Sequence, residues 1–304
     1  MGQFTRLART VPLPPAGREL LANPRRTPAL TRDRFTGVRR LSSLPYLFEH
    51  RADFESVETY CLFVGHGRTG HSLVGSLLNG NRSMVVSHEL DALRVLDRAT
   101  VPLSRDQLFA AILQRDAEFT GLGREWEKYS YDIPNTAQGE FDDLRVIGDK
   151  KGAATTRRLG HSPELLGDLR ETVSVPLRAV HVVRNPFDTI ASRRKLKETW
   201  REYGVEKYFA NADNVELVSE LLAEDELFRL HYEDLVADTA GVLADLCAFL
   251  GVEASEDYLA ACDEFVFDAP KQTRYEVEWD DAEKARIAEK NREYDWLEQY
   301  TFDQ

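Results

Sequence analysis

A glycine-rich turn separates an apolar run from an amphipathic segment in the first third of the chain. The run Tyr60–Val64 is typical of a buried strand. The turn Gly65–Gly70 leads into Leu73–Leu78, whose apolar residues fall on one face of a helix. Glycines let such a turn point several backbone N–H groups inward, and the helix N-terminus adds about half a positive charge. A strand, a glycine turn and a helix in this order predict a phosphate-binding loop.

The spacing in this turn matches the P-loop pattern of nucleotide-binding proteins, with one departure. An NTPase carries a lysine where this chain has His71, and that lysine reaches the β- and γ-phosphates of the nucleotide. Its replacement argues against hydrolysis of ATP or GTP, and Arg68 supplies a cation from another point of the loop. An ordinary glycine turn between a strand and a helix is the alternative interpretation.

A second candidate phosphate site lies where the expected strand Leu177–Val183 meets a helix that begins near Pro186. Arg184 stands at this junction, and Ser192 lies two turns along the helix. Open α/β sheets bind ligands at such strand ends, and a guanidinium group can contact a phosphate through two hydrogen bonds. The alternative is that Arg184 forms only a salt bridge, for example with Asp188.

Both stretches resemble the binding motifs of the PAPS-dependent sulfotransferases, where PAPS is 3′-phosphoadenosine 5′-phosphosulfate. Residues 63–65 with 68–72 resemble the 5′-phosphosulfate loop, although His71 stands where the family usually has threonine. Residues 184–192 are similar to the 3′-phosphate site, whose arginine and serine have the same spacing. The motif layout is closest to tyrosylprotein and carbohydrate sulfotransferases and to bacterial members. The resemblance implies these PAPS-binding residues: Gly67, Arg68, Thr69, Gly70, His71, Ser72, Arg184, Ser192 and Arg274.

Two weaker matches extend the resemblance to about Tyr300. Residues 271–274, with Trp279, stand where the family has a loop that closes over the 3′-phosphate, and they include Arg274 but lack the usual glycines. Tyr232–Leu235 is similar to a family segment that begins a structural helix. The resemblance does not cover the N-terminal residues.

Glu89 follows a short expected strand, Met84–Val86, so its side chain is expected to face the ligand crevice. In the tyrosylprotein and carbohydrate sulfotransferases, a glutamate at this offset from the loop cation is the general base. The resemblance therefore implies that Glu89 takes the proton of the acceptor hydroxyl. The alternative is a first-turn glutamate in a helix capped by Ser87, and His88 and Asp91 are rival bases.

A lysine pair, Lys150 and Lys151, follows the expected strand Arg145–Gly148. It resembles the position of the family's lysine that contacts the oxygen between phosphate and sulfate. A cation there stabilises the charge that develops on the leaving group. Lys150 is the preferred candidate, Lys151 is the second, and a solvated lysine pair is the alternative.

The composition is that of a soluble globular protein, with 42% hydrophobic and 30% charged residues in a chain of 304. No apolar run approaches the roughly 18 residues that a membrane span needs, and no secretory signal is present. Golgi members of the family carry a membrane anchor; because this sequence shows no such apolar run, a cytoplasmic enzyme is expected.

The three cysteines, Cys61, Cys247 and Cys262, match neither a disulfide framework nor a metal-binding motif, so no metal is expected.

Charge divides the chain into an arm and a body. Residues 1–40 contain nine arginines, no lysine and only Glu19 and Asp33. Subtracting this +7 from the net charge of −13 leaves −20 for the remainder. An acidic body argues against nucleic-acid binding. We expect an irregular arm over residues 1–45, either packed on the body or acting as a transit peptide, and one α/β domain over 46–304.

Strands alternate with helices along the body, which predicts a three-layer α/β fold: a central parallel sheet flanked by helices around a P-loop-like nucleotide-binding core. Among the expected helices are Arg18–Ala22, His88–Ala99, Arg105–Phe119, Asn214–Glu224, Glu233–Leu250 and Asp280–Tyr300.

The resulting hypothesis is an enzyme that transfers the sulfuryl group from PAPS, in line, to a hydroxyl or amine and releases PAP. One alternative is a P-loop kinase or phosphotransferase with Asp149 as its magnesium ligand, and another is a catalytically degenerate nucleotide-binding protein, which His71 favours. The acceptor, whether a small molecule, a carbohydrate or a peptide, and the oligomeric state are left open because loops determine them.

Overall fold

The computed structural model describes residues 42–99, 101–126, 128–196 and 204–303. The expected helix Arg18–Ala22 and most of the N-terminal arm lie outside these ranges. The expected boundary between arm and body, at residues 45 and 46, falls inside the first described helix, α4 (Leu44–Glu49).

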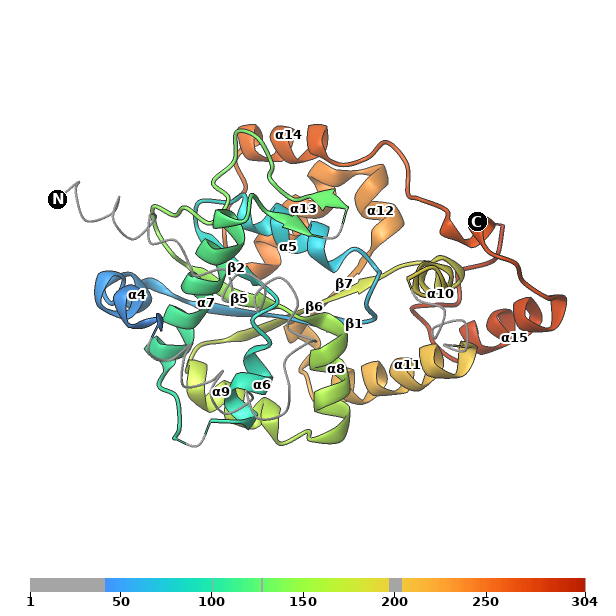
Figure 1. Cartoon of the computed structure of the whole chain (residues 1–304), viewed down its shortest axis with the longest axis horizontal. Coiled ribbons are helices and arrows are strands. Elements are labelled where there is room, and N and C mark those ends of the chain that lie inside the picture. The colour runs from blue at the N-terminus through green and yellow to red at the C-terminus, as the bar shows by residue number, and fades with distance from the viewer. Residues whose placement is uncertain (1–41, 100, 127, 197–203, 304) are drawn as a thin grey trace.

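A parallel sheet forms the centre of the described chain, as the alternation of strands and helices predicted (Figure 1). Its five strands stand in the order β2-β5-β1-β6-β7, and every neighbouring pair is parallel. The strands are β1 (Thr59–Gly65), β2 (Met84–His88), β5 (Val146–Lys150), β6 (Leu177–Val183) and β7 (Leu227–His231). Because parallel strands end at the same edge, the segments after all five are brought together.

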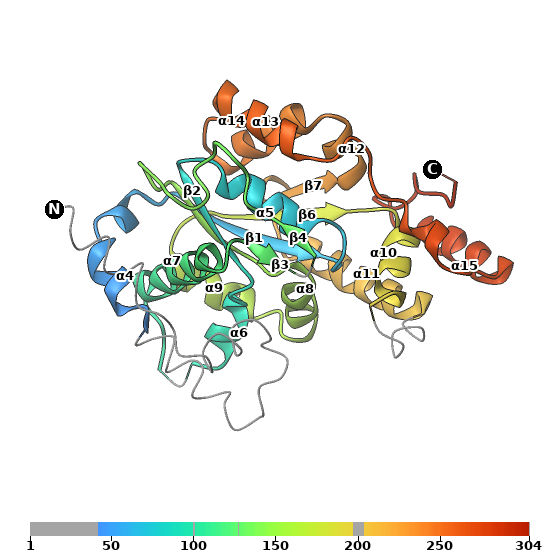
Figure 2. The ribbon, with the colours of Figure 1, turned by 45° about the horizontal axis from the view of Figure 1, so that its top comes forward.

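Helices cover both faces of this sheet, which makes three layers (Figure 2). Successive side chains of β1 explain why: Tyr60 and Leu62 belong to one hydrophobic core, whereas Cys61 and Phe63 belong to the other. The first core is built with α4 and with α6 (Ala92–Asp97), α7 (Arg105–Gly121), α8 (Gly152–His161), α9 (Leu165–Val173) and α11 (Val205–Glu220). The second is built with α5 (His71–Asn79), α12 (Tyr232–Ala237), α13 (Thr239–Leu250) and α14 (Glu256–Phe265).

A third core joins the end of β6 to the C-terminal part of the chain. It combines residues of α10 (Pro186–Arg194), α11 and α15 (Asp281–Asn291) with Tyr294–Tyr300. Smaller elements complete the described structure: β3 (Glu125–Trp126), β4 (Tyr129–Ser130), η3 (Asp53–Ser56), η5 (Glu224–Glu226) and η6 (Thr273–Glu276).

The prediction that a helix begins at His88 is wrong. Ser87 and His88 belong to β2, where His88 lies opposite Lys150, and α6 begins only at Ala92. The Ser87 hydroxyl donates to the Asp149 carboxylate at 3.0 Å instead of capping a helix. Burial of β2 on both sides therefore overrides the local capping signal.

Three other helices differ from expectation. The segment expected as one helix, 233–250, is divided into α12 and α13, because the Asp238 carboxylate accepts from the Gly241 N–H and begins a new helix. The C-terminal helix stops at Asn291 rather than Tyr300, and α11 begins at Val205 rather than Asn214. No helix in the described part of the chain is both long enough and apolar enough to span a membrane.

Candidate active site

The carboxyl edge of the sheet gathers nearly all of the sequence-predicted residues. The glycine turn follows β1, Glu89 follows β2, Lys150 ends β5, Arg184 follows β6, and Glu233 lies in the first turn after β7. The parallel register explains how residues distant in sequence meet here, since His88 pairs with Lys150 and their neighbours therefore adjoin. This is the edge where open α/β sheets bind ligands.

The glycine turn has the backbone of a tight loop that only certain residues tolerate. Gly70 has a φ of +105°, and a Cβ there would stand 2.5 Å from the ring of Tyr232. Arg68 also has a positive φ, of 80°. Inside the turn, the Thr69 hydroxyl donates to the His66 carbonyl at 2.9 Å, so the Thr69 side chain braces the loop itself.

His71 also acts inside the fold, although it occupies the lysine position of the P-loop pattern. Its buried Nε2 donates to the Val64 carbonyl at 2.9 Å. Burial, together with the neighbouring Lys150 cation, lowers the pKa of His71 to about 3, so the imidazole is neutral. His71 thus ties the end of β1 to the start of α5 and supplies no cation at neutral pH.

The first N–H groups of α5 donate no hydrogen bond to a capping side chain. Its N-cap is Gly70, which has no side chain to accept hydrogen bonds from the first N–H groups of the helix. These groups and the helix dipole favour a negative charge at this point. Ser72 lies in the first turn and directs its hydroxyl to Lys150.

Lys150 is the centre of a charged cluster beside this helix start. Its Nζ donates to Ser72 Oγ at 2.9 Å and to Glu89 Oε1 at 3.3 Å, while Lys151 pairs with Glu89 Oε2. A Cβ on Gly75 would stand 3.1 Å from Lys150 Cγ, so the lysine stem packs on α5. The side chain is only 4% exposed. Predicted residues from three separate segments therefore meet in one cluster.

The ionisation of Glu89 depends on the two lysines. Burial alone raises the pKa of Glu89, but the Lys150 and Lys151 cations outweigh it and hold that pKa well below its ordinary value. Glu89 is therefore a carboxylate at neutral pH, the form that a general base requires.

Asp149 fixes the short loop that carries Glu89. Its carboxylate accepts from Ser87 Oγ at 3.0 Å, from the Leu90 N–H at 2.8 Å and from the Ala92 N–H at 3.0 Å. Glu89 itself has a φ of +60°, a conformation that these hydrogen bonds hold in place. Both carboxylate oxygens of Asp149 are thus engaged within the fold.

His88 lies beside the cluster but within the apolar layer. Its ring stacks on Phe119 with centroids 4.1 Å apart, and Trp126 lies next to it at 4.9 Å. Burial lowers the pKa of His88 well below its ordinary value. His88, Ser72 and Lys150 line a small cavity of about 10 Å³, room for roughly one water molecule.

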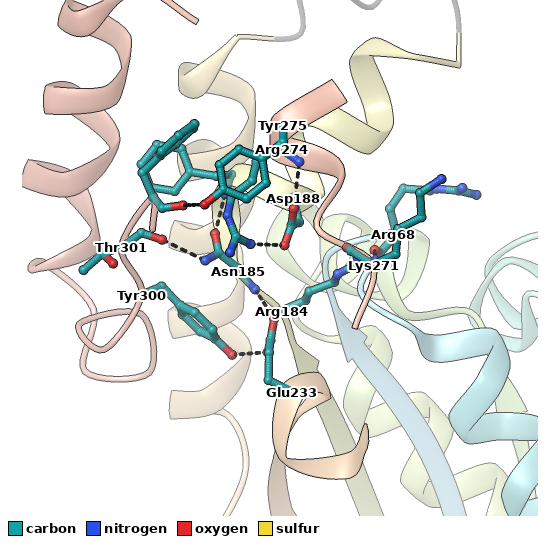
Figure 3. A network of polar contacts seen from close by, with 12 residues as sticks. Arg68, Arg184, Asn185, Asp188, Glu233, Lys271, Arg274, Tyr275, Tyr300 and Thr301 are labelled. Carbon is teal, nitrogen blue, oxygen red and sulfur yellow. Dashed lines mark hydrogen bonds and ion pairs between the residues drawn. The ribbon is translucent and has the colours of Figure 1, made fainter. Parts of the chain in front are cut away.

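The second predicted group joins the glycine turn to α10 and to the residue after β6. Arg68 Nε donates to Ser192 Oγ at 3.0 Å, which joins the turn to α10. Arg184 donates to the carbonyls of Arg68, at 3.4 Å, and Lys271 (Figure 3). Its guanidinium stacks 4.9 Å from the Tyr232 ring centroid. Its Nε is buried without a hydrogen-bond partner among the described residues.

Arg274 does not lie open to this site. It is 2% exposed and donates both its backbone N–H, at 2.8 Å, and its Nη1, at 2.5 Å, to the Asp188 carboxylate. Asp188 is therefore the partner of Arg274 and not of Arg184, contrary to the alternative raised from the sequence. The pair ties the segment that carries Lys271 to α10 (Figure 3).

Some contacts at the site were not foreseen. Arg193 donates to the Gly67 carbonyl at 3.2 Å, and Thr156 accepts from the Gly65 N–H at 2.7 Å. Tyr232 packs against both Gly70 and Arg184. The position of Tyr232 directly after a strand was a usable signal, as it was for Glu89, whereas Thr156 lies inside a helix and carried none.

In the described ranges, no three His, Cys, Asp or Glu side chains lie close enough together to hold a metal ion. Cys61, Cys247 and Cys262 are free and buried. Burial raises the pKa of each thiol, so these cysteines act as small apolar core residues.

The chain resembles known proteins over most of its length. The model of the sulfotransferase family matches residues 62–257, well over half of the chain. The sulfotransferase domain of the olefin synthase from Synechococcus PCC 7002 is 17% identical, covering 79% of this chain and 96% of that one, with a TM-score of 0.49. Sulfotransferase STF9 from Mycobacterium avium is 15% identical, covering 95% and 88%, with a TM-score of 0.48. No curated protein matches significantly. This chain belongs to the sulfotransferase family.

Proposed function

We propose that this chain transfers the sulfuryl group of PAPS to a hydroxyl or amine of an acceptor. The catalytic residues in this proposal are Glu89 as the general base and Lys150 as the cation beside the transferred group. The proposed catalytic unit is a single domain over residues 46–304. The identity of the acceptor is open, and the cytoplasmic location stays a prediction.

The observation that carries the proposal is the presence of two cationic groups beside the start of α5, whose first N–H groups have no capping side chain. On one side Lys150 contacts Ser72 and Glu89, and on the other Arg68 contacts Ser192. A bisphosphate nucleotide with a sulfuryl group on one phosphate carries negative charge at two separated places. This charge pattern matches the two groups.

The residues fit PAPS in chemical type. The turn Gly67–Ser72 and the helix start would hold the 5′-phosphosulfate through backbone N–H groups. Arg184 and Ser192 would hold the 3′-phosphate, and the buried Nε of Arg184 is a donor that a phosphate oxygen would satisfy. Thr69 and His71 would support the loop from within rather than contact the nucleotide through their side chains.

Glu89 would remove the proton of the acceptor as the acceptor oxygen or nitrogen attacks sulfur. The bond between sulfur and the bridging oxygen of PAPS breaks in the same in-line step, and PAP leaves with the electron pair of that bond. Lys150 would stabilise the charge that grows on the bridging oxygen. The proton ends on the Glu89 carboxylate and is lost to solvent.

The pairing of Glu89 with the lysines gives the site a way to become more basic. Lys150 already divides its hydrogen bonds between Ser72 and Glu89. A sulfuryl oxygen beside Ser72 would draw Lys150 toward itself, and the pKa of Glu89 would then rise toward its ordinary value. A stronger base would thus be available when the donor is bound.

The kinase alternative is disfavoured by the environment of Asp149. A magnesium ligand must have an oxygen directed at the metal, whereas both oxygens of this carboxylate accept hydrogen bonds from the chain. Asp149 is also buried, at 2% exposure.

Calorimetry with PAP and with ATP tests the proposal without knowledge of the acceptor. PAP should bind at least tenfold more tightly than ATP and should not need magnesium, because ATP has no 3′-phosphate for Arg184. Equal affinities for the two nucleotides, or a strict need for magnesium, would overturn the proposal.

A further inference from the structure

The junction between β6 and α10 is held by residues from two distant parts of the chain. It consists of Arg184, Asn185 and Pro186, where strand direction changes into helix direction. Contacts reach it from the start of α12 and from the last described residues of the chain (Figure 3). The sequence motifs assign no role in PAPS binding to the residues of α12 and of the C-terminal segment that make these contacts.

Glu233 bridges the junction to the C-terminal segment. One carboxylate oxygen accepts from the backbone N–H of Asn185 at 3.0 Å, and the other accepts from the hydroxyl of Tyr300 at 2.8 Å. Each oxygen of the carboxylate therefore serves one of the two segments (Figure 3). Hydrogen bonds to a charged acceptor are stronger than those between neutral groups.

Asn185 is fixed from the same side by a second C-terminal contact. Its Nδ2 donates to the Thr301 carbonyl at 2.9 Å, and its Oδ1 accepts from the Phe187 N–H as the N-cap of α10. The ring of Phe302 packs edge-on against Phe187 with centroids 5.2 Å apart. Arg184 directly precedes Asn185 in the chain. The contacts that fix Asn185 therefore also determine how the Arg184 side chain is oriented at the end of β6.

We infer that Tyr300 and Glu233 are positioning residues for the 3′-phosphate site, because their hydrogen bonds orient the Arg184–Asn185 peptide. This inference rests on the proposed function, since it requires that Arg184 bind the 3′-phosphate. Neither residue contacts the nucleotide in this account; both act through Arg184. Tyr300 lies 116 positions after Arg184 in the chain.

The Tyr300 hydroxyl has a defined role that a phenylalanine would lose. It lies 2.8 Å from His231 Nδ1 as well as donating to Glu233. In Tyr300→Phe, Gln299 Nε2, which lies 2.9 Å from His231 Nδ1, can donate to that nitrogen once the other imidazole tautomer forms, so the main loss falls on the Glu233 carboxylate. The aromatic ring and its packing in the third core are kept.

The test compares PAP with AMP, which lacks the 3′-phosphate, on the full chain. By calorimetry, Tyr300→Phe should weaken PAP binding roughly 3- to 10-fold and leave AMP binding unchanged. Glu233→Gln should also lower the ratio of PAP affinity to AMP affinity, because its amide nitrogen cannot accept a hydrogen bond. Tyr294→Phe is the matched control, because Tyr294 donates to the Asp213 carboxylate at 2.6 Å in the same core.

The outcomes separate this inference from the function on which it rests. If parent protein binds PAP and AMP equally, the 3′-phosphate site is misassigned and the inference fails with it. If the parent prefers PAP but Tyr300→Phe and Glu233→Gln keep that preference, the inference alone is overturned. A loss of preference equal to that of Tyr294→Phe would mean general loosening of the core, which also overturns it.

Discussion

Arg184 combines contacts that are unusual for a surface arginine. Its guanidinium donates to two backbone carbonyls, stacks on Tyr232 and keeps a buried Nε without a partner among the described residues. A carbonyl oxygen is a weaker partner for a guanidinium than a phosphate is. The side chain is thus held near one orientation before a ligand binds, which reduces the entropy lost on binding.

Replacement of Arg184 by alanine should weaken PAP binding by about 2–3 kcal/mol, or roughly 30- to 150-fold, through loss of charge-assisted hydrogen bonds. Arg178→Ala is the matched control, because Arg178 lies on β6, the strand that Arg184 follows, and its partner Asp225 is largely exposed, so far weaker coupling is expected. Calorimetry on both folded variants measures the difference. An unchanged PAP affinity in Arg184→Ala would show that another group binds the 3′-phosphate.

Elements with a strong burial pattern were predicted well from sequence. The boundaries of β6 agree with expectation, and β1 extends the expected strand by one residue at each end. Both strands lie inside the sheet with helices on each face, so they read as continuous apolar runs. The glycine turn and the residue after each strand followed from the same logic, which is why the sequence predicted that Arg68, Glu89, Lys150 and Arg184 stand at strand ends.

Elements whose boundaries depend on distant partners were predicted poorly. Ser87 has the type and place of a helix cap, but the buried carboxylate of Asp149 binds it from a strand 62 positions away. The C-terminal helix has a charged, periodic sequence past Asn291, yet Tyr294 and Trp296 turn into the third core and end it. Local patterns contain no information about such partners.

The pairing of side chains at the site could not be predicted from local sequence either. The sequence showed that Asp188 could pair with an arginine but not that its partner is Arg274, 86 positions later. The link from Tyr300 to Glu233 spans 67 positions and has no motif. Residue types suggested which groups could bind phosphate, whereas only the fold reveals which charges are already paired.

At the scale of the whole molecule, buried histidines in and around the glycine turn couple stability to pH. Burial lowers the pKa of His66 and of His71 to about 3, and it lowers that of His181 well below the ordinary value. These rings stay neutral in the folded chain, whereas in the unfolded chain each takes up a proton near pH 6.5. Their stabilising contribution is therefore full above pH 6.5 and is lost as the pH falls toward about 3.

The free energy of unfolding should fall between pH 7.5 and pH 5.5, with a contribution of about 1.4 kcal/mol from each of these histidines and about 4 kcal/mol from the three. Urea unfolding at the two pH values measures the change. His181→Leu should make this decrease smaller by about 1.4 kcal/mol, because leucine takes up no proton on unfolding. The variant should still fold, since neither ring nitrogen of His181 has a hydrogen-bond partner among the described residues. Burial also raises the pKa of Asp116 and Asp149, but this contribution is the same in the parent and in His181→Leu and cancels in the difference between them. The same pH dependence in parent and variant would refute the assignment.

Transfer of the sulfuryl group itself is the central claim, and it depends most directly on Glu89. Glu89→Gln keeps the shape of the side chain and one acceptor oxygen but cannot take a proton in the transition state. His88→Phe is the matched control, because it keeps the stacking on Phe119 and removes the rival base. PAP affinity, measured on the same preparations, should be close to the parent value in both.

The decisive measurement is kcat for transfer of labelled sulfate from PAPS to an acceptor on which the parent protein is active. Glu89→Gln should lower kcat by about 10²- to 10⁴-fold, since general base catalysis contributes that much and ground-state contacts survive. His88→Phe should retain most of the parent turnover. The account is contradicted if Glu89→Gln keeps more than about a tenth of the parent kcat while His88→Phe is inactive, because His88 would then be the base.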